Sequence, residues 1–91
     1  MKFVYPACFY KEEDGRYSVE FSDFPLSTFG NNLVEAMYMA ADAAAGRIAL
    51  MLEDGEALPE ASDLKNVLPE DESGFASMVY IDLDALTART A

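Results

Sequence analysis

The chain has 91 residues, enough for one compact domain, and 52% of them are apolar, so it is not a disordered chain. Acidic residues outnumber Lys and Arg by 17 to 6, which gives a formal net charge of −11. This balance argues against nonspecific binding to nucleic acids or to anionic membranes, because both need a basic surface. The negative charge is compatible with a basic partner, and equally with an acidic surface that only keeps the protein soluble.

The first two strands are predicted from the alternation of side chains. Residues 2–10 are largely apolar on both faces of a strand, and Asp14 followed by Gly15 is typical of a hairpin turn. Residues 16–22 alternate between apolar and polar side chains, so one face of the second strand is polar. Pro6 is a poor residue for a central strand because it lacks an N–H donor. A bulge or a locally unpaired edge would accommodate it.

A short third strand at 27–29 precedes a long helix. Asn32 followed by Glu35 is typical of an N-cap with its capping-box partner, and Gly55 fits a C-terminal cap. The helix is therefore predicted to begin at Asn31 or Asn32 and to end just before Gly55, with a length of about 30 Å. Its apolar stripe, at helical spacing, consists of Leu33, Ala36, Met37, Ala40, Ala44, Ile48, Met51 and Leu52.

A polar connection, 53–74, follows the helix. Within it, Asp63–Leu68 is predicted to form a short helix that is capped by Ser62. The fourth strand is predicted at 75–83 because apolar and β-branched residues return there. The tail, 87–91, is expected to be unstructured.

These elements predict an α+β fold with a small mixed sheet in strand–strand–strand–helix–strand order, within one domain over residues 1–86. The crossover through the long helix should return the fourth strand parallel to an earlier one. The helix covers one face of the sheet. The other face must be covered either by Asp63–Leu68 or by a second copy of the chain, and we expect a homodimer. The expected dimer face consists of Val4, Cys8, Tyr10, Met78 and Tyr80.

The residue types restrict the possible chemistry. The chain has no histidine and one cysteine, Cys8, which excludes zinc sites built on these residues, histidine-dependent triads and an intramolecular disulfide. Cys8 is interpreted as a packing residue of its strand. Acids cluster at 12–14 and 70–72, but both clusters lie in predicted turns and are interpreted as solvated. No metal or cofactor is predicted, and the absence of a signal peptide or membrane span predicts a cytoplasmic location.

The segment "YPACFYKEEDGRYSVEFSDFP", residues 5–25, resembles the opening of HicB-type antitoxins. It has a Tyr-Pro-Ala strand, an acidic glycine turn and a Tyr-Ser-Val-x-Phe-x-Asp-x-Pro motif. The similarity continues through "TFGNNLVEAMYMAADA" and "MLEDGEALPEAS", and 75–83 resembles the last sheet strand of that family. Several motifs in the right order make the resemblance specific.

The resemblance implies the N-terminal domain of such an antitoxin, with a partial RNase H-like fold. It also implies that the chain sequesters a small basic mRNA-cleaving toxin of the HicA type. Two features depart from the family. Leu26-Ser27 stands where Gly-Cys is usual, and no C-terminal DNA-binding domain is expected after the last strand, so DNA binding is not carried over.

Two alternatives remain beside the antitoxin. One is a stand-alone structural or regulatory dimer with another partner. The other is a metal-dependent nuclease, although residues 2–10 contain no carboxylate where working enzymes of the RNase H fold carry one on the first strand.

The elbow after the second strand is the predicted docking patch for a partner. Apolar residues stand next to acids there, a combination suited to recognition. The predicted docking residues are Glu20, Asp23, Phe24, Pro25 and Leu26. The alternative is that Phe24 simply caps the core at this turn.

Overall fold

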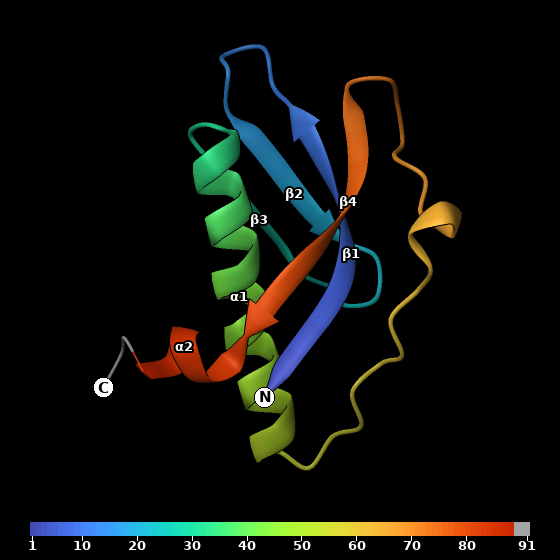
Figure 1. The fold of residues 1–91 in the computed structure, drawn as a ribbon. Helices are drawn as coiled ribbons and strands as arrows, with labels where there is room; N and C mark the ends of the chain where they lie inside the picture. The colour runs from blue at the N-terminus through green and yellow to red at the C-terminus, as the bar shows by residue number, and fades with distance from the viewer. Residues whose placement is uncertain (89–91) are drawn as a thin grey trace.

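The computed structural model describes residues 1–88 and confirms the α+β class and the predicted order of the elements. A four-stranded sheet in the order β3-β2-β1-β4 has the long helix α1 on one side, and the connection that follows α1 runs along the other side (Figure 1). The elements are β1 (Lys2–Lys11), β2 (Tyr17–Phe21), β3 (Ser27–Gly30), α1 (Leu33–Glu53), the short 3-10 helix η1 (Leu64–Asn66), β4 (Gly74–Asp82) and α2 (Leu83–Ala88).

The sheet is antiparallel throughout, so the prediction of a mixed sheet is wrong. β4 pairs antiparallel with β1, from Lys2 opposite Asp82 to Tyr10 opposite Gly74. The cause is the connection between α1 and β4. It runs along the sheet once more after α1 has already crossed it, so β4 begins beside the end of β1 (Figure 1).

Pro6 fits in β1 because its nitrogen faces away from β4. Two backbone hydrogen bonds flank the β1–β4 ladder, and both join odd-numbered residues: Lys11 to Ser73, and Leu83 to Met1. Since bonded and non-bonded pairs alternate in an antiparallel ladder, Pro6 and Met78 form a non-bonded pair. The Pro6 nitrogen therefore points toward β2, one position beyond the last paired residue, Phe21. Pro6 O still accepts a hydrogen bond from Ser22 N at 3.5 Å, so only the bond that an N–H of residue 6 would donate is missing at this end of the β1–β2 ladder.

The helix α1 begins and ends where its caps were predicted. Asn32 Oδ1 accepts a hydrogen bond from Glu35 N at 2.8 Å, and Glu35 Oε1 accepts one from Asn31 N at 3.0 Å. These bonds satisfy N–H groups of the first turn that have no partner within the helix. At the other end Gly55 has a φ of +73°, and its N–H donates to Leu52 O at 3.2 Å, as in a Schellman motif.

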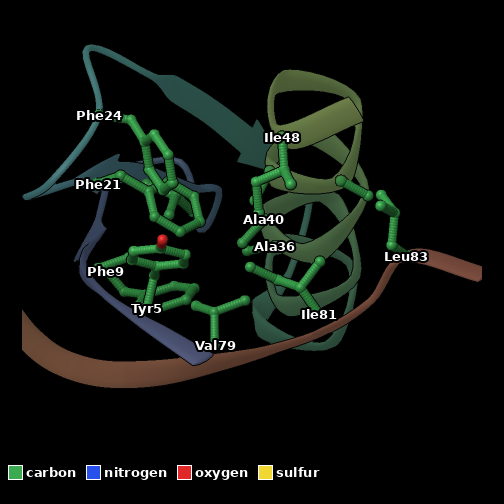
Figure 2. Packing of buried hydrophobic residues seen from close by; sticks show 14 residues of the cluster. Tyr5, Phe9, Phe21, Phe24, Ala36, Ala40, Ile48, Val79, Ile81 and Leu83 are labelled. Atoms are coloured by element: carbon green, nitrogen blue, oxygen red, sulfur yellow. The ribbon is translucent and has the colours of Figure 1, made fainter. Parts of the chain in front are cut away.

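Small side chains bring α1 close to the sheet. The alanine face of the helix is buried together with Ile48 (Figure 2), whereas Leu33 and Met37, at the edges of the predicted stripe, are each 38% exposed. Gly30 in β3 lies directly under the first turn of the helix. A Cβ atom at this position would overlap the backbone of Ala36, so glycine is required for the observed helix–sheet distance.

Aromatic rings fill the rest of the core. The rings of Tyr5, Phe9, Phe21 and Phe24 gather on the α1 side of the sheet, beside Val79 and Ile81 of β4 (Figure 2). Burial of these large side chains supplies most of the stabilisation that a domain of this size can obtain.

The connection after α1 covers part of the second sheet face. Glu70 N donates a hydrogen bond to Tyr10 Oη at 3.0 Å, and Cys8 is only 6% exposed. Glu70, two residues beyond the predicted cover Asp63–Leu68, therefore holds the connection over Tyr10. Val4 and Tyr80, which face each other on β1 and β4, stay 43% and 58% exposed.

Two local predictions are wrong. The predicted helix Asp63–Leu68 is only the single turn η1, and Ser62 does not cap it, because the Ser62 hydroxyl donates to Asp23 instead. Residues 87 and 88 of the predicted unstructured tail belong to α2, which continues directly from β4. Residues 89–91 of that prediction lie outside the described residues.

Candidate functional site

The predicted docking elbow is built around a buried aromatic ring. Phe24 is 4% exposed, and its ring centroid lies 4.6 Å from that of Tyr5 and 6.1 Å from that of Phe21, both edge to face. The expectation that Phe24 offers an exposed docking surface is therefore wrong. It caps the core at this turn, which was the alternative interpretation.

Asp23 also serves the fold. Its carboxylate accepts hydrogen bonds from Ser62 N at 3.0 Å and from Ser62 Oγ at 2.5 Å, and nearby Tyr5 Oη donates to Pro59 O at 2.6 Å. These contacts fasten the connection after α1 to the elbow. Leu26 is partly buried against the core. Of the five predicted residues, only Pro25 and Glu20 are exposed.

Glu20 belongs to an acidic hollow on the second sheet face. The hairpin turn after β1 and the turn before β4 meet there, because β1 pairs with both β2 and β4. The hollow has a volume of about 220 Å³, and we call it the acidic groove. It is lined by Tyr10, Glu12, Ser18, Glu20, Glu70, Asp71 and Ser73.

Hydrogen bonds hold the walls of the acidic groove. Ser18 Oγ donates to Glu12 Oε1 at 2.9 Å. Ser73 donates to Asp71 Oδ1 through its hydroxyl at 2.5 Å and its N–H at 2.9 Å. These two bonds lower the pKa of the Asp71 carboxyl below its usual value of 3.8, so it is ionised at neutral pH. The groove therefore presents fixed negative charge.

A second, wider hollow of about 650 Å³ shares Glu12 and Ser18 with the acidic groove, so the two are continuous. Among the described residues that line it, the one cation is Arg16, and it is already engaged: Arg16 Nε lies 2.8 Å from Asp14 Oδ2, and the guanidinium lies 5.8 Å from the centre of the Phe29 ring. Across both hollows, six carboxylates face this one arginine. The region is suited to a cationic surface with an apolar contact at its edge.

Cys8 is buried in β1 and pairs with Glu20 of the acidic groove. Burial raises the pKa of its thiol. A hydrogen bond with Tyr10 opposes this shift, and the carboxylates of Glu20 and Glu70 add to it. A thiol must ionise to react, so burial and a raised pKa both disfavour reaction of Cys8 at neutral pH. This agrees with its interpretation as a packing residue.

The acids of the groove do not form a metal site. Within residues 1–88 no three His, Cys, Asp or Glu side chains converge in a way that could hold a metal ion. The same part of the chain contains no helix of the length and apolarity that crossing a membrane requires.

Most groove residues were missed as site residues by reasoning from the sequence. The acids at 12–14 and 70–72 were noted but interpreted as separate solvated turns. Each is indeed exposed, yet pairing of both neighbours with β1 brings the two turns together. The 55% exposure of Phe29 in β3 points to the same surface, but it is visible only in the structure.

The match to known proteins agrees with this architecture. Residues 5–91 match the model of a family described as HicB_like antitoxin of bacterial toxin-antitoxin system. The chain belongs to the HicB-like antitoxin family. A relative from Haemophilus phage HP1, an uncharacterized 14.9 kDa protein in the rep-hol intergenic region, is 35% identical over 89 residues. The match covers 94% of this HicB-like chain and 66% of the relative, just under two thirds of its length.

Solved structures share the fold of this HicB-like chain. A chain of a toxin-antitoxin complex from Streptococcus pneumoniae superimposes with a TM-score of 0.83 and 27% identity, over 93% of this chain and 72% of that one. A chain of the HicA3 and HicB3 toxin-antitoxin complex gives a TM-score of 0.71 and 24% identity, over 88% and 99% of the two chains. At the latter identity the likeness concerns the fold alone.

Proposed function

We propose that this chain is an antitoxin-type binding module that sequesters a small basic mRNA-cleaving toxin of the HicA type in the cytoplasm. The observation that carries the proposal is the acidic groove, on a chain of the HicB-like family. Four carboxylates line the acidic groove, where two turns distant in sequence meet, and the wider hollow continuous with it adds two more carboxylates and the internally paired Arg16. Such a surface attracts a cationic protein and repels the phosphates of nucleic acids. The proposed role is therefore the binding of a protein, without catalysis.

The recognition surface extends from the acidic groove to Phe29. Glu20 and Glu70 supply charge in the groove, and Phe29 supplies an exposed apolar contact at the edge of the wider hollow. In protein interfaces a few residues dominate the binding energy, and aromatic side chains are common among them. The originally predicted Glu20 is thus retained in the binding surface, while Phe24 and Asp23 act through the fold.

Charge reversal tests the proposal. In Glu20→Lys with Glu70→Lys, affinity for a catalytically inactive HicA-type toxin should fall by about three- to thirtyfold, because each reversed charge costs a few tenths to one kcal/mol. The matched control is Glu53→Lys with Glu56→Lys. This control makes the same change in net charge at exposed positions near the C-terminal end of α1, outside the acidic groove, and it should bind like the wild type.

Two measurements decide the outcome. Calorimetric titration of the wild type should show affinity falling as salt rises from 50 to 300 mM, because the complementary charges are screened. Co-expression with the active toxin should restore growth for the wild type and the control but not for the groove variant. Equal loss of binding in both double variants, or no binding of any HicA-type toxin, would contradict the proposal and favour a regulator with another partner.

A further inference from the structure

We propose that the outer edge of β4 is a pairing site for a second copy of this chain. The two copies form one continuous sheet through an antiparallel β4–β4 pair. This surface is distinct from the acidic groove, so the inference does not rest on toxin binding.

The backbone of β4 is open on its outer side. β4 is an edge strand, and within residues 1–88 no backbone hydrogen bond outside its ladder with β1 reaches residues 75–82. Odd-numbered residues bond to β1, so Ala76, Met78 and Tyr80 direct their N–H and C=O groups outward. The Ser77 hydroxyl donates to Met78 O at 3.1 Å, but this carbonyl has a second lone pair.

The two edges of the sheet differ in how they are protected. β3, at the other edge, is only four residues long, and short edge strands resist pairing with other chains. β4 has nine residues, about 30 Å in length, without proline. Its only charged residue is Asp82 at the end of the strand. A long, uncharged edge is the form of strand that recruits another strand.

The sequence of β4 is complementary to itself. In a two-fold pair centred on Met78, Tyr80 of one copy lies opposite Ala76 of the second copy, so a large side chain meets a small one. Asp82 lies opposite Gly74, and the two Asp82 carboxylates stay apart, which avoids a direct like-charge pair. Tyr80 and Phe75, 58% and 39% exposed in the single chain, become more buried in this arrangement.

Charge also favours the edge as the meeting point of two copies. Each chain has a net charge of −11, so any face that carries the acidic groove would repel its copy. The uncharged stretch from Gly74 to Ile81 is where two such chains can approach. Salt screens the remaining repulsion, so self-association should strengthen as salt rises, whereas binding of a basic toxin should weaken.

The first test is the mass of the full chain by sedimentation equilibrium. The wild type should dimerise at about 10–100 μM, as expected for a small interface, and more tightly at 300 mM than at 50 mM salt. Ala76→Pro removes one outward N–H and leaves the β1 ladder intact, so it should raise the dissociation constant by about tenfold or more. Val4→Lys adds a charge on the same sheet face but in an inner strand, and it should dimerise like the wild type. Circular dichroism checks that both variants are folded.

The second test is the register. In a Cys8→Ala background, Met78→Cys places two cysteines opposite each other across the two-fold axis, with Cα atoms about 5.5 Å apart, within reach of a disulfide. It should form a covalent dimer on mild oxidation. Tyr80→Cys is the matched control, because the two copies of that residue are offset by several positions, and it should remain monomeric on denaturing gels.

Three results would overturn the proposal. The first is a wild type that stays monomeric at 500 μM in high salt. The second is a dimer that is lost in Val4→Lys but kept in Ala76→Pro, which would assign the interface to the sheet face. The third is a monomeric wild type whose toxin binding is abolished by Ala76→Pro, which would assign the edge to the toxin.

Discussion

Replacement of Phe24 tests whether the elbow after β2 stabilises the fold or binds the partner. Its ring is 4% exposed and packs edge to face on Tyr5 and Phe21. Replacement of a buried phenylalanine by alanine costs about 3–5 kcal/mol, a range that includes lost aromatic contacts and the cavity left behind. The elbow lies at the surface and relaxes in part, so for Phe24→Ala we expect about 3–4 kcal/mol.

The matched substitution is Phe29→Ala. The Phe29 ring is 55% exposed, and its clearest contact is with the Arg16 guanidinium at 5.8 Å. An exposed cation–π contact is worth about 0.5–1 kcal/mol, so Phe29→Ala should lower the unfolding free energy by about 1 kcal/mol. The two variants lose the same side chain and differ in where it lies.

Urea denaturation measures both values, and an unchanged m-value would show that the change lies in stability alone. Binding to a HicA-type toxin then gives the opposite ranking: Phe29→Ala weakens it, and the folded fraction of Phe24→Ala binds like the wild type. The reasoning is refuted if Phe24→Ala costs less than about 1 kcal/mol. Toxin binding that depends on Phe24 and not on Phe29 would likewise restore the elbow as the docking patch.

Four further predictions concern stability. Gly30→Ala should destabilise the protein by about 2 kcal/mol or more in urea denaturation, because the new Cβ overlaps the backbone of α1. Gly46→Ala, with open space around it in the same helix, should stabilise it by up to about 1 kcal/mol. Asn32→Ala should lower the unfolding free energy by about 1 kcal/mol through loss of the N-cap, and Asn32→Ser should retain most of it. Hydrogen bonds from Ser73 lower the pKa of the Asp71 carboxyl. The ionised carboxylate therefore stabilises the fold fully above pH 3.8, and this stabilisation is lost as pH falls through the lowered folded-state pKa. In Asp71→Asn the melting temperature should depend less steeply on pH below about 4.

Local features of the chain could be predicted because each depends on a few neighbouring residues. The caps at Asn32 and Gly55 follow from hydrogen bonds over three or four positions and from a positive φ. The hairpin at Asp14-Gly15 is equally local, and Gly15 has a φ of +91°. The predicted bounds of the strands differ from the structure by no more than one residue at any end, because they too depend on neighbouring residues.

The environment of Phe24 could not be predicted from local pattern. A Phe-Pro-Leu turn between polar residues is typical both of an exposed patch and of a lid on the core. The choice depends on Ser62, 39 positions away, whose N–H and hydroxyl donate to Asp23 and fix the elbow against the connection. The prediction of the apolar stripe was wrong at its edges for a similar reason. The alanines allow α1 to approach the sheet closely, and Leu33 and Met37 then stay exposed.

The error in strand direction and the missed groove have a single cause. A helix between two strands usually returns the chain to the end of the sheet where it started, and the next strand is then parallel to the preceding one. Here the connection travels the length of the sheet again and delivers the acids at 70–72 to the end where the β1–β2 hairpin carries the acids at 12–14. A parallel β4 would begin at the other end of the sheet and separate the two clusters. The antiparallel direction of β4 therefore brings the two acidic turns together and creates the acidic groove. The position of β4 as an outermost strand leaves the edge that a second copy can extend.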